Sequence, residues 1–183
     1  EMGDDVLTSD GRSVAVKWVG RQVIQNLPWM HAAHEPVCIS AGALGGGCPR
    51  ADLYVSPDHG MIWQGLVVNA SAMVNGHSIR FVPQSELPHE FTYYHIETDA
   101  HEEILVNGTP AETFIDYAGR RSFDNYDEYI ALYGADRRIR ELPRPRISAR
   151  RQLPQRLRQH LGLPATDAAL RAEAAALTRH LSA

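Results

Sequence analysis

The stretch "RSVAVKWVG", Arg12–Gly20, decides the fold class because its side chains alternate along the chain. Val14, Val16 and Trp18 fall on one face of an extended segment, and the residues between them fall on the other. A period of two residues is typical of a β-strand that buries one face. The sequence therefore predicts a strand over residues 12–20.

Further short strands are predicted along the chain after residue 20. The period of two recurs in "HSIRFV" and "EFTYYHIET", and "VCIS" and "DLYVS" are shorter apolar runs. Dipeptides suited to tight hairpins separate such runs, namely Asp10-Gly11, Asn75-Gly76 and Asn107-Gly108. Many short strands joined by tight turns favour an all-β sandwich or partly closed barrel over a parallel α/β sheet.

Helical periodicity replaces this pattern from about Ser122 onward. Residues 124–134, "DNYDEYIALYG", predict a helix with an aromatic face that begins after Asp or Asn and ends at Gly134. A basic, proline-rich linker follows, and Pro154 then opens a helix that carries two leucines before Gly162. Thr166 is predicted to cap a last, alanine-rich helix. The expected units are a β domain over 1–121, a helical extension over 122–136, and a basic linker with a helical tail over 137–183.

Charge is distributed unevenly along the 183 residues. Residues 1–136 hold 7 Lys and Arg against 19 Asp and Glu, whereas residues 137–183 hold 11 against 3, and the balances of −12 and +8 give the net charge of −4. The split predicts an acidic body and a basic tail. Nine arginines lie between Arg137 and Arg158 and would suit phosphates. Without interleaved aromatic residues, however, contact with solvent or with the acidic body is favoured over a nucleic-acid partner.

Composition excludes several classes of protein. The hydrophobic content of 44% suits a globular core, and no apolar run approaches the roughly 20 residues that cross a bilayer. Cys38 and Cys48 are expected to be free thiols rather than a disulfide framework. The cluster Gly45–Gly47 opens no evident helix, so it is interpreted as a flexible loop and not as a phosphate cradle.

The clearest candidate for acid–base chemistry is His59 in "YVSPDHG", Tyr54–Gly60, where a strand enters a turn. The Ser56 hydroxyl and the Asp58 carboxylate stand beside His59 in sequence and are expected to orient its ring. Among the other histidines, His31 and His34 are expected to be solvated. His59, His95 and His101 would suit a zinc-type site and a metal-dependent hydrolase, although no HExxH or CxxC spacing supports this alternative.

Five segments in order resemble the Hint superfamily, the hedgehog/intein self-processing domains, and most closely its bacterial branch. They are "GDDVLTSDG", "VAVKWVGRQ", "VCISAGALGGG", "DLYVSPDH" and "LVNGTPAETF", between Gly3 and Phe114. The resemblance implies a Hint-type horseshoe, a partly closed β-fold of short antiparallel strands and hairpins, followed here by an α-helical tail. It implies autocatalysis without a cofactor, metal or membrane, inside a larger bacterial protein that is cytoplasmic or secreted.

The resemblance also implies roles for individual residues. Ser56-x-x-His59 matches the family's Thr-x-x-His block, in which the histidine contacts the scissile amide and helps to protonate its nitrogen, while the hydroxyl polarises that peptide. His101 stands where a second histidine assists later acyl transfer. His95 follows Tyr94 in place of the family's aspartate, so it is either a replacement acid–base group or a partner that orients His59.

Two departures from the family pattern define the expected reaction. Hint domains begin with a cysteine, less often a serine, that attacks the preceding carbonyl. This nucleophile and the first strand are expected upstream of Glu1, since Cys38 and Cys48 do not match its position. Glu112 and Thr113 replace the His-Asn that ends inteins, so complete splicing is not expected.

The predicted function is therefore autoproteolysis at the N-terminal junction. An acyl shift to an upstream cysteine would activate that peptide bond, and water, a thiol or an amine would accept the flanking polypeptide. The chain alone would then be inactive. The first alternative is a degenerate Hint scaffold that serves as a protein-binding module with an acidic partner, and the second is the metal-dependent hydrolase.

Overall fold

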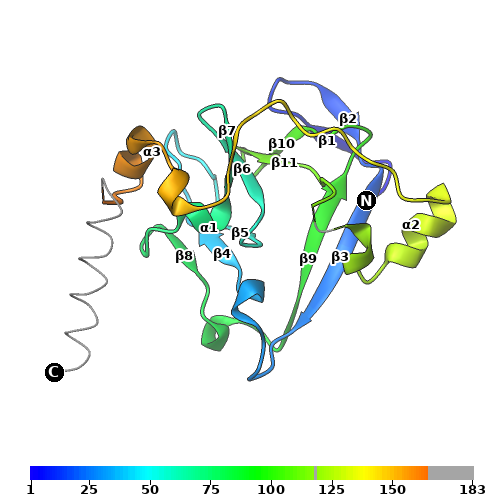
Figure 1. The fold of residues 1–183 in the computed structure, drawn as a ribbon, viewed down its shortest axis with the longest axis horizontal. Coiled ribbons are helices and arrows are strands. Elements are labelled where there is room, and N and C mark those ends of the chain that lie inside the picture. The colour runs from blue at the N-terminus through cyan, green and yellow to red at the C-terminus, as the bar shows by residue number, and fades with distance from the viewer. Residues whose placement is uncertain (118, 165–183) are drawn as a thin grey trace.

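The computed structural model describes residues 1–117 and 119–164, and strands dominate this part of the chain (Figure 1). Four small sheets are present among the described residues, and none closes on itself as a barrel. The predicted all-β architecture of short antiparallel strands, followed by helices, is confirmed. The helix predicted from Thr166 lies outside the described residues.

Two two-stranded sheets and one three-stranded sheet form the first half of the fold. A short hairpin pairs β1 (Asp5–Leu7) with β2 (Ser13–Ala15). A long ribbon pairs β3 (Trp18–Gln25) with β9 (Glu90–Glu97), in register from Trp18 opposite Glu97 to Gln25 opposite Glu90. The three-stranded sheet has the order β5 (Leu53–Val55), β4 (Val37–Ile39), β8 (Ile79–Phe81).

The five-stranded sheet carries most of the second half of the chain. Its order is β10 (Glu103–Val106), β11 (Thr109–Glu112), β6 (Gly60–Trp63), β7 (Leu66–Asn69), β12 (Arg146–Ile147). The α-helices are α1 (Ala70–Met73), α2 (Tyr126–Tyr133) and α3 (Gln155–His160). The 3₁₀ turns are η1 (Ala32–His34), η2 (Gln84–Glu86), η3 (Arg120–Ser122) and η4 (Arg150–Gln152).

The prediction of one strand over residues 12–20 is wrong, because the chain changes its pairing partner there. The Val16 amide donates to the Asp4 carbonyl, whereas the next amide, that of Lys17, donates to the Glu97 carbonyl. The side chains of Val16 and Trp18 are both buried as the alternation suggests. The alternation of apolar side chains therefore identified the buried face, but it did not reveal the boundary between β2 and β3.

The hairpin predictions are confirmed at two of three turns. Asp10-Gly11 joins β1 to β2, and Asn107-Gly108 joins β10 to β11 with φ of 50° and 79°. The prediction for Asn75-Gly76 is wrong, because this turn joins α1 to β8 and does not join two strands. An unpredicted hairpin joins β6 to β7 through Gln64-Gly65, again with both φ positive.

The C-terminal helices contribute to both hydrophobic cores of the described chain. The larger core includes Leu157 of α3, which is completely buried among side chains of the three- and five-stranded sheets. The smaller core packs Tyr129 of α2 against Trp18, Phe114 and Phe123. Helix α2 begins after Asn125 and ends at Gly134, whose φ is 76°, as the sequence predicts.

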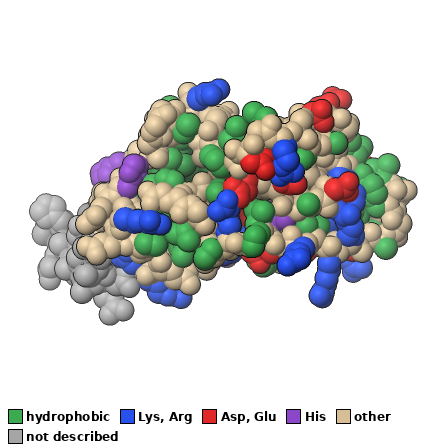
Figure 2. Space-filling model, turned by 90° about the horizontal axis from the view of Figure 1, so that it is seen from above, with side chains coloured by type: hydrophobic (Ala, Val, Ile, Leu, Met, Phe, Trp, Pro, Cys, Tyr) green, Lys and Arg blue, Asp and Glu red, His purple; other side chains and the backbone are tan. Residues whose placement is uncertain are grey.

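The linker between α2 and η4 crosses the β-structure (Figure 1), and its strand β12 pairs in parallel with β7. Its arginines contact acidic side chains of the body, with Arg137 on Asp99 and Arg144 on Glu103. Figure 2 shows acidic and basic side chains lying next to one another on this face. No helix in the described ranges is both long and apolar enough to cross a membrane.

The burial of α3 predicts that Leu157→Ala strongly destabilises the protein. Loss of the completely buried side chain leaves a cavity, and such substitutions lower the free energy of unfolding by about 2–5 kcal/mol. Urea denaturation measures the change. Arg156→Ala, at an exposed position of the same helix, is the matched control and should change stability by no more than about 0.5 kcal/mol. Equal effects of the two substitutions would contradict the packing of α3 in the core.

Candidate active site

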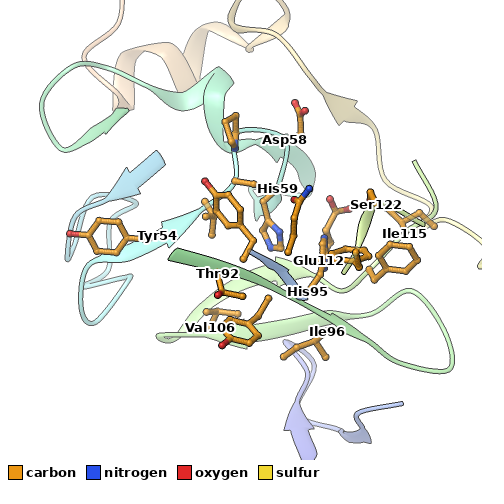
Figure 3. Close-up of a pocket in the computed structure, with 18 of the residues that line it drawn as sticks. Tyr54, Asp58, His59, Thr92, His95, Ile96, Val106, Glu112, Ile115 and Ser122 are labelled. Atoms are coloured by element: carbon orange, nitrogen blue, oxygen red, sulfur yellow. The ribbon is translucent and has the colours of Figure 1, made fainter. Parts of the chain in front are cut away.

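A cavity of about 460 Å³ opens between the turn after β5, strand β9 and the end of β11. Its walls are largely apolar and aromatic, and they include Tyr93, Ile104 and Phe114. A few polar groups converge on it, among them His59, His95 and Glu112 (Figure 3). A mainly apolar cavity with a few convergent polar groups has the usual composition of a ligand or active site.

The turn that carries His59 is held by backbone hydrogen bonds. The His59 amide donates to the Ser56 carbonyl at 3.0 Å, which closes the turn. The first helical amides of α1 hold it from the other side, since Ala70 donates to the His59 carbonyl and Ser71 to the Pro57 carbonyl, each at 2.9 Å. The ring of His59 is thus presented from a backbone fixed at three points.

His59 and His95 form a ring pair at the cavity wall (Figure 3). Their ring centroids lie 5.0 Å apart with an interplanar angle of 42°, and His95 also meets Phe114 edge-on at 5.6 Å. Burial lowers the pKa of His59, and burial together with the adjacent His59 lowers the pKa of His95 to about 3. Both imidazoles are therefore neutral near pH 7, and His95 stays neutral well into the acidic range.

Glu112 supplies a buried negative charge beside this pair. Its Oε1 accepts hydrogen bonds from the Gly60 amide at 2.9 Å and from Arg146 Nη1 at 3.0 Å, and Arg146 Nη2 donates to Oε2. Burial would raise the pKa of Glu112, but His101 and Arg146 outweigh it and lower the pKa to about 2. The site thus combines two neutral imidazoles with a fixed carboxylate.

His101 lies behind Glu112 and is absent from the cavity lining described above. Its Nε2 is 3.1 Å from Glu112 Oε2, and its Nδ1 accepts a hydrogen bond from the Leu142 amide at 3.0 Å. Because Nδ1 is an acceptor, we assign the ring proton of the neutral form to Nε2, facing the carboxylate. His101 therefore acts on the cavity through Glu112.

The structure does not gather the histidines into a metal site. Both nitrogens of His101 face protein groups, and no group of three or more His, Cys, Asp or Glu residues within 1–117 and 119–164 is arranged to hold a metal ion. The geometry therefore gives no support to the hydrolase alternative built on His59, His95 and His101.

The remaining predicted site residues have mixed placements. Ser56 and Asp58 both line the cavity. The Asp58 carboxylate, however, accepts a hydrogen bond from Asn69 Nδ2 at 3.2 Å and points away from the His59 ring (Figure 3), so it does not orient that ring as expected. His34, expected in solvent, also lines the cavity. Cys38 is buried and Cys48 half-buried, both as free thiols.

Two charged residues of the site were not predicted as functional. Glu112 entered the sequence analysis only as a departure from the intein ending, and Arg146 only as one of many arginines in a basic linker. The only local signal was a charged residue beside one or two apolar residues, in "TPAE" and "RPRI". That signal does not reveal which charges meet when the chain folds.

A comparison with protein families agrees with the fold. The family model described as the Hint domain matches residues 1–118. No curated protein and no solved structure matches the chain. The match spans well over half of the sequence and includes His59, His95, His101 and Glu112. The chain belongs to the Hint domain family, the family of hedgehog- and intein-type self-processing domains.

Proposed function

We propose that the full-length protein cleaves the peptide bond at the N-terminal junction of this domain through an acyl shift to a cysteine upstream of Glu1. The observation that carries the proposal is the pair of neutral imidazoles, His59 and His95, held 5.0 Å apart in a cavity beside the buried Glu112 carboxylate. The substrate is the flanking polypeptide of the same chain.

In the proposed first step, the cysteine sulfur attacks the carbonyl carbon of the preceding peptide bond. Neutral His59 takes the thiol proton and returns it to the amide nitrogen as the C–N bond breaks, so that a thioester and a free amine result. We assign Ser56, which lines the cavity on the same turn, the role of donating a hydrogen bond to the scissile carbonyl. Water, a thiol or an amine then attacks the thioester, takes the acyl group and releases the cysteine thiol.

The carboxylate of Glu112 supports this proton transfer electrostatically. Its negative charge favours the protonated form of His59, which is the form that exists between the two proton transfers. An anion that stabilises a transient imidazolium lowers the barrier without taking the proton itself. We assign His95 the role of a neutral neighbour that orients the His59 ring, and His101 that of a partner that orients Glu112.

Cleavage or ligation is proposed rather than complete splicing. Splicing of the intein type needs an asparagine that cyclises at the end of the domain. Glu112 and Thr113 occupy that region here and both are buried, with Glu112 held as an anion by Arg146. Thr113 stands at the position of the asparagine, and neither its hydroxyl group nor the Glu112 carboxylate has an amide nitrogen to attack the backbone. These two residues therefore do not support release of a C-terminal flank.

The binding-module alternative is less well supported. It requires a basic segment that is free to contact an acidic partner. Arg137, Arg144 and Arg146 of the linker instead contact Asp99, Glu103 and Glu112 of the same chain. Their charges are largely satisfied within the molecule.

The first prediction of this mechanism concerns His59. In the full-length protein, His59→Ala should slow dithiothreitol-induced cleavage by about 10²–10⁴-fold, the usual contribution of general acid–base catalysis. Mass spectrometry of the released fragments over time measures the rate. His77→Ala, at an exposed turn, is the control and should cleave as the unsubstituted protein does. An unchanged rate for His59→Ala would remove His59 from the mechanism.

The second prediction concerns pH and the stability of the chain. The pKa of His95 is about 3 in the folded state and about 6.5 when unfolded. The unfolded state therefore binds the extra proton as the pH falls below about 6.5, and folding stability is lost in that direction. His95→Gln should reduce the slope of unfolding free energy against pH by about 1.4 kcal/mol per unit below that pH. Urea denaturation between about pH 5 and 6.5 checks the slope, with exposed His89→Gln as the control; equal slopes for all three proteins would refute it.

A further inference from the structure

We propose that residues 137–147, which lie beyond the family match, form part of the catalytic site, and that Arg146 is a positioning residue that holds the Glu112 carboxylate beside His59 and His95. The catalytic consequence rests on the function proposed above. The structural part of the inference rests on contacts of this segment alone.

Arg146 is fixed from several sides. Its guanidinium makes two hydrogen bonds to Glu112, Nη1 also donates to Asn69 Oδ1 at 3.3 Å, and Nε donates to Glu141 Oε1 at 3.4 Å. The ring of Tyr117 lies 4.8 Å from the centre of the guanidinium. Two parallel N–H bonds to one carboxylate define its orientation as well as its charge.

The backbone of the same segment explains why Arg146 reaches Glu112. Arg146 lies in β12 opposite Val67 of β7, in the sheet whose strand β11 ends at Glu112. Four residues earlier, the Leu142 amide donates to His101 Nδ1. The segment therefore acts on Glu112 twice, directly through Arg146 and indirectly by setting the proton of His101 on the nitrogen that faces the carboxylate.

The charged and titratable groups around His59 come from several elements. They are His95 of β9, Glu112 of β11, Arg146 of β12, His101 before β10, and Asp58 of its own turn, which is bonded to Asn69. Tyr117, which also lines the cavity, and Glu141 contact Arg146. Glu112 and Arg146 have opposite effects on His59, since the carboxylate favours protonation of the ring and the guanidinium disfavours it. Removal of either partner leaves the charge of the other acting alone.

This opposition predicts shifts of opposite sign in the titration of His59. Arg146→Gln should raise its midpoint by about one pH unit, and Glu112→Gln should lower it, because a nearby charge shifts a pKa by one or more units. Arg146→Lys should stay near the unsubstituted protein, and the double variant Glu112→Gln/Arg146→Gln should return towards it. NMR of the imidazole C–H signals of the 183-residue chain measures the midpoints, with His59 assigned by His59→Gln.

If one single variant fails to fold, the other still tests the sign of its own shift. The double variant and Arg146→Lys preserve the charge balance of the site and supply the reference midpoints for that comparison. A purely structural role would give lost folding or no shift, but not two shifts of opposite sign that cancel in the double variant. Shifts of the same sign, or midpoints that all coincide, would overturn the proposal.

Cleavage of the full-length protein tests the catalytic consequence. The pH–rate profile of Arg146→Gln should move in the same direction as the His59 midpoint, whereas Arg144→Gln should leave it in place, since Arg144 pairs with Glu103 and not with Glu112. A displaced His59 titration with an unmoved profile would overturn the catalytic role of Arg146. If dithiothreitol induces no cleavage of the full-length protein at the N-terminal junction, the proposed function fails; if His59→Ala alone leaves cleavage unchanged, only the role of His59 fails. In either case the titration still decides whether Arg146 positions Glu112.

Discussion

The buried carboxylate of Glu112 is the constraint on which the site depends. An ionised carboxylate away from water is costly unless hydrogen bonds and an opposite charge compensate it. Here the compensation comes from three separate segments, through the Gly60 amide of β6, Arg146 of β12 and His101 before β10. At Gly60 a Cβ would collide with the Glu112 carboxylate and with Val67. Only glycine therefore fits directly after His59. The hydrogen bond from the Gly60 amide to the Glu112 carboxylate holds the end of the His59 turn in place.

A second buried pair repeats this arrangement in the smaller core. Arg120 donates to both oxygens of the completely buried Glu97, at 2.7 and 3.0 Å, and its guanidinium lies between the rings of Phe114 and Tyr129. In each pair the glutamate comes from residues 1–118 and the arginine from residues beyond. Tyr129 and Leu157 likewise complete the two cores from beyond the match. Residues 119–164 thus complete both hydrophobic cores and both buried ion pairs. The described fold therefore continues past residue 118, where the family match ends.

The parts of the fold predicted from sequence are those determined by local patterns. Alternation identified strand β9 and the buried face of Val16 and Trp18. Asn-Gly and Asp-Gly chemistry identified two hairpins, because positive φ is accessible to those residues. The β6–β7 hairpin was missed for two reasons. Its strands are buried on both faces and so do not alternate, and its turn uses Gln64, a residue with no special preference for φ above zero.

The histidines of the candidate site were predictable from local sequence and from the family pattern, whereas its electrostatics depend on contacts between distant residues. His59 and His95 were identified together and do meet in the cavity. Asp58 and His59 are neighbours in sequence, yet the carboxylate that faces His59 is Glu112, 53 positions along the chain and brought there by pairing of β11 with β6. Sequence adjacency suggested the wrong carboxylate because side chains on a tight turn diverge, whereas adjacent strands of a sheet bring distant residues together.

The uneven distribution of charge along the sequence is likewise resolved by contacts between residues that are distant in the chain. An acidic first part and a basic second part predicted a basic tail that contacts solvent or the acidic body, and the arginines at 137, 144 and 146 do contact Asp99, Glu103 and Glu112 of that body. Arg120, within the acidic part, pairs with Glu97. Charges separated in sequence lie side by side in space (Figure 2). Two of these pairs are buried, where screening by salt is weak, and both place an arginine beyond the family match on a carboxylate within it. The basic segment is therefore better understood as the counter-charge of the β-structure. Burial keeps the histidine pair in the cavity neutral, and Arg146 compensates the carboxylate beside it.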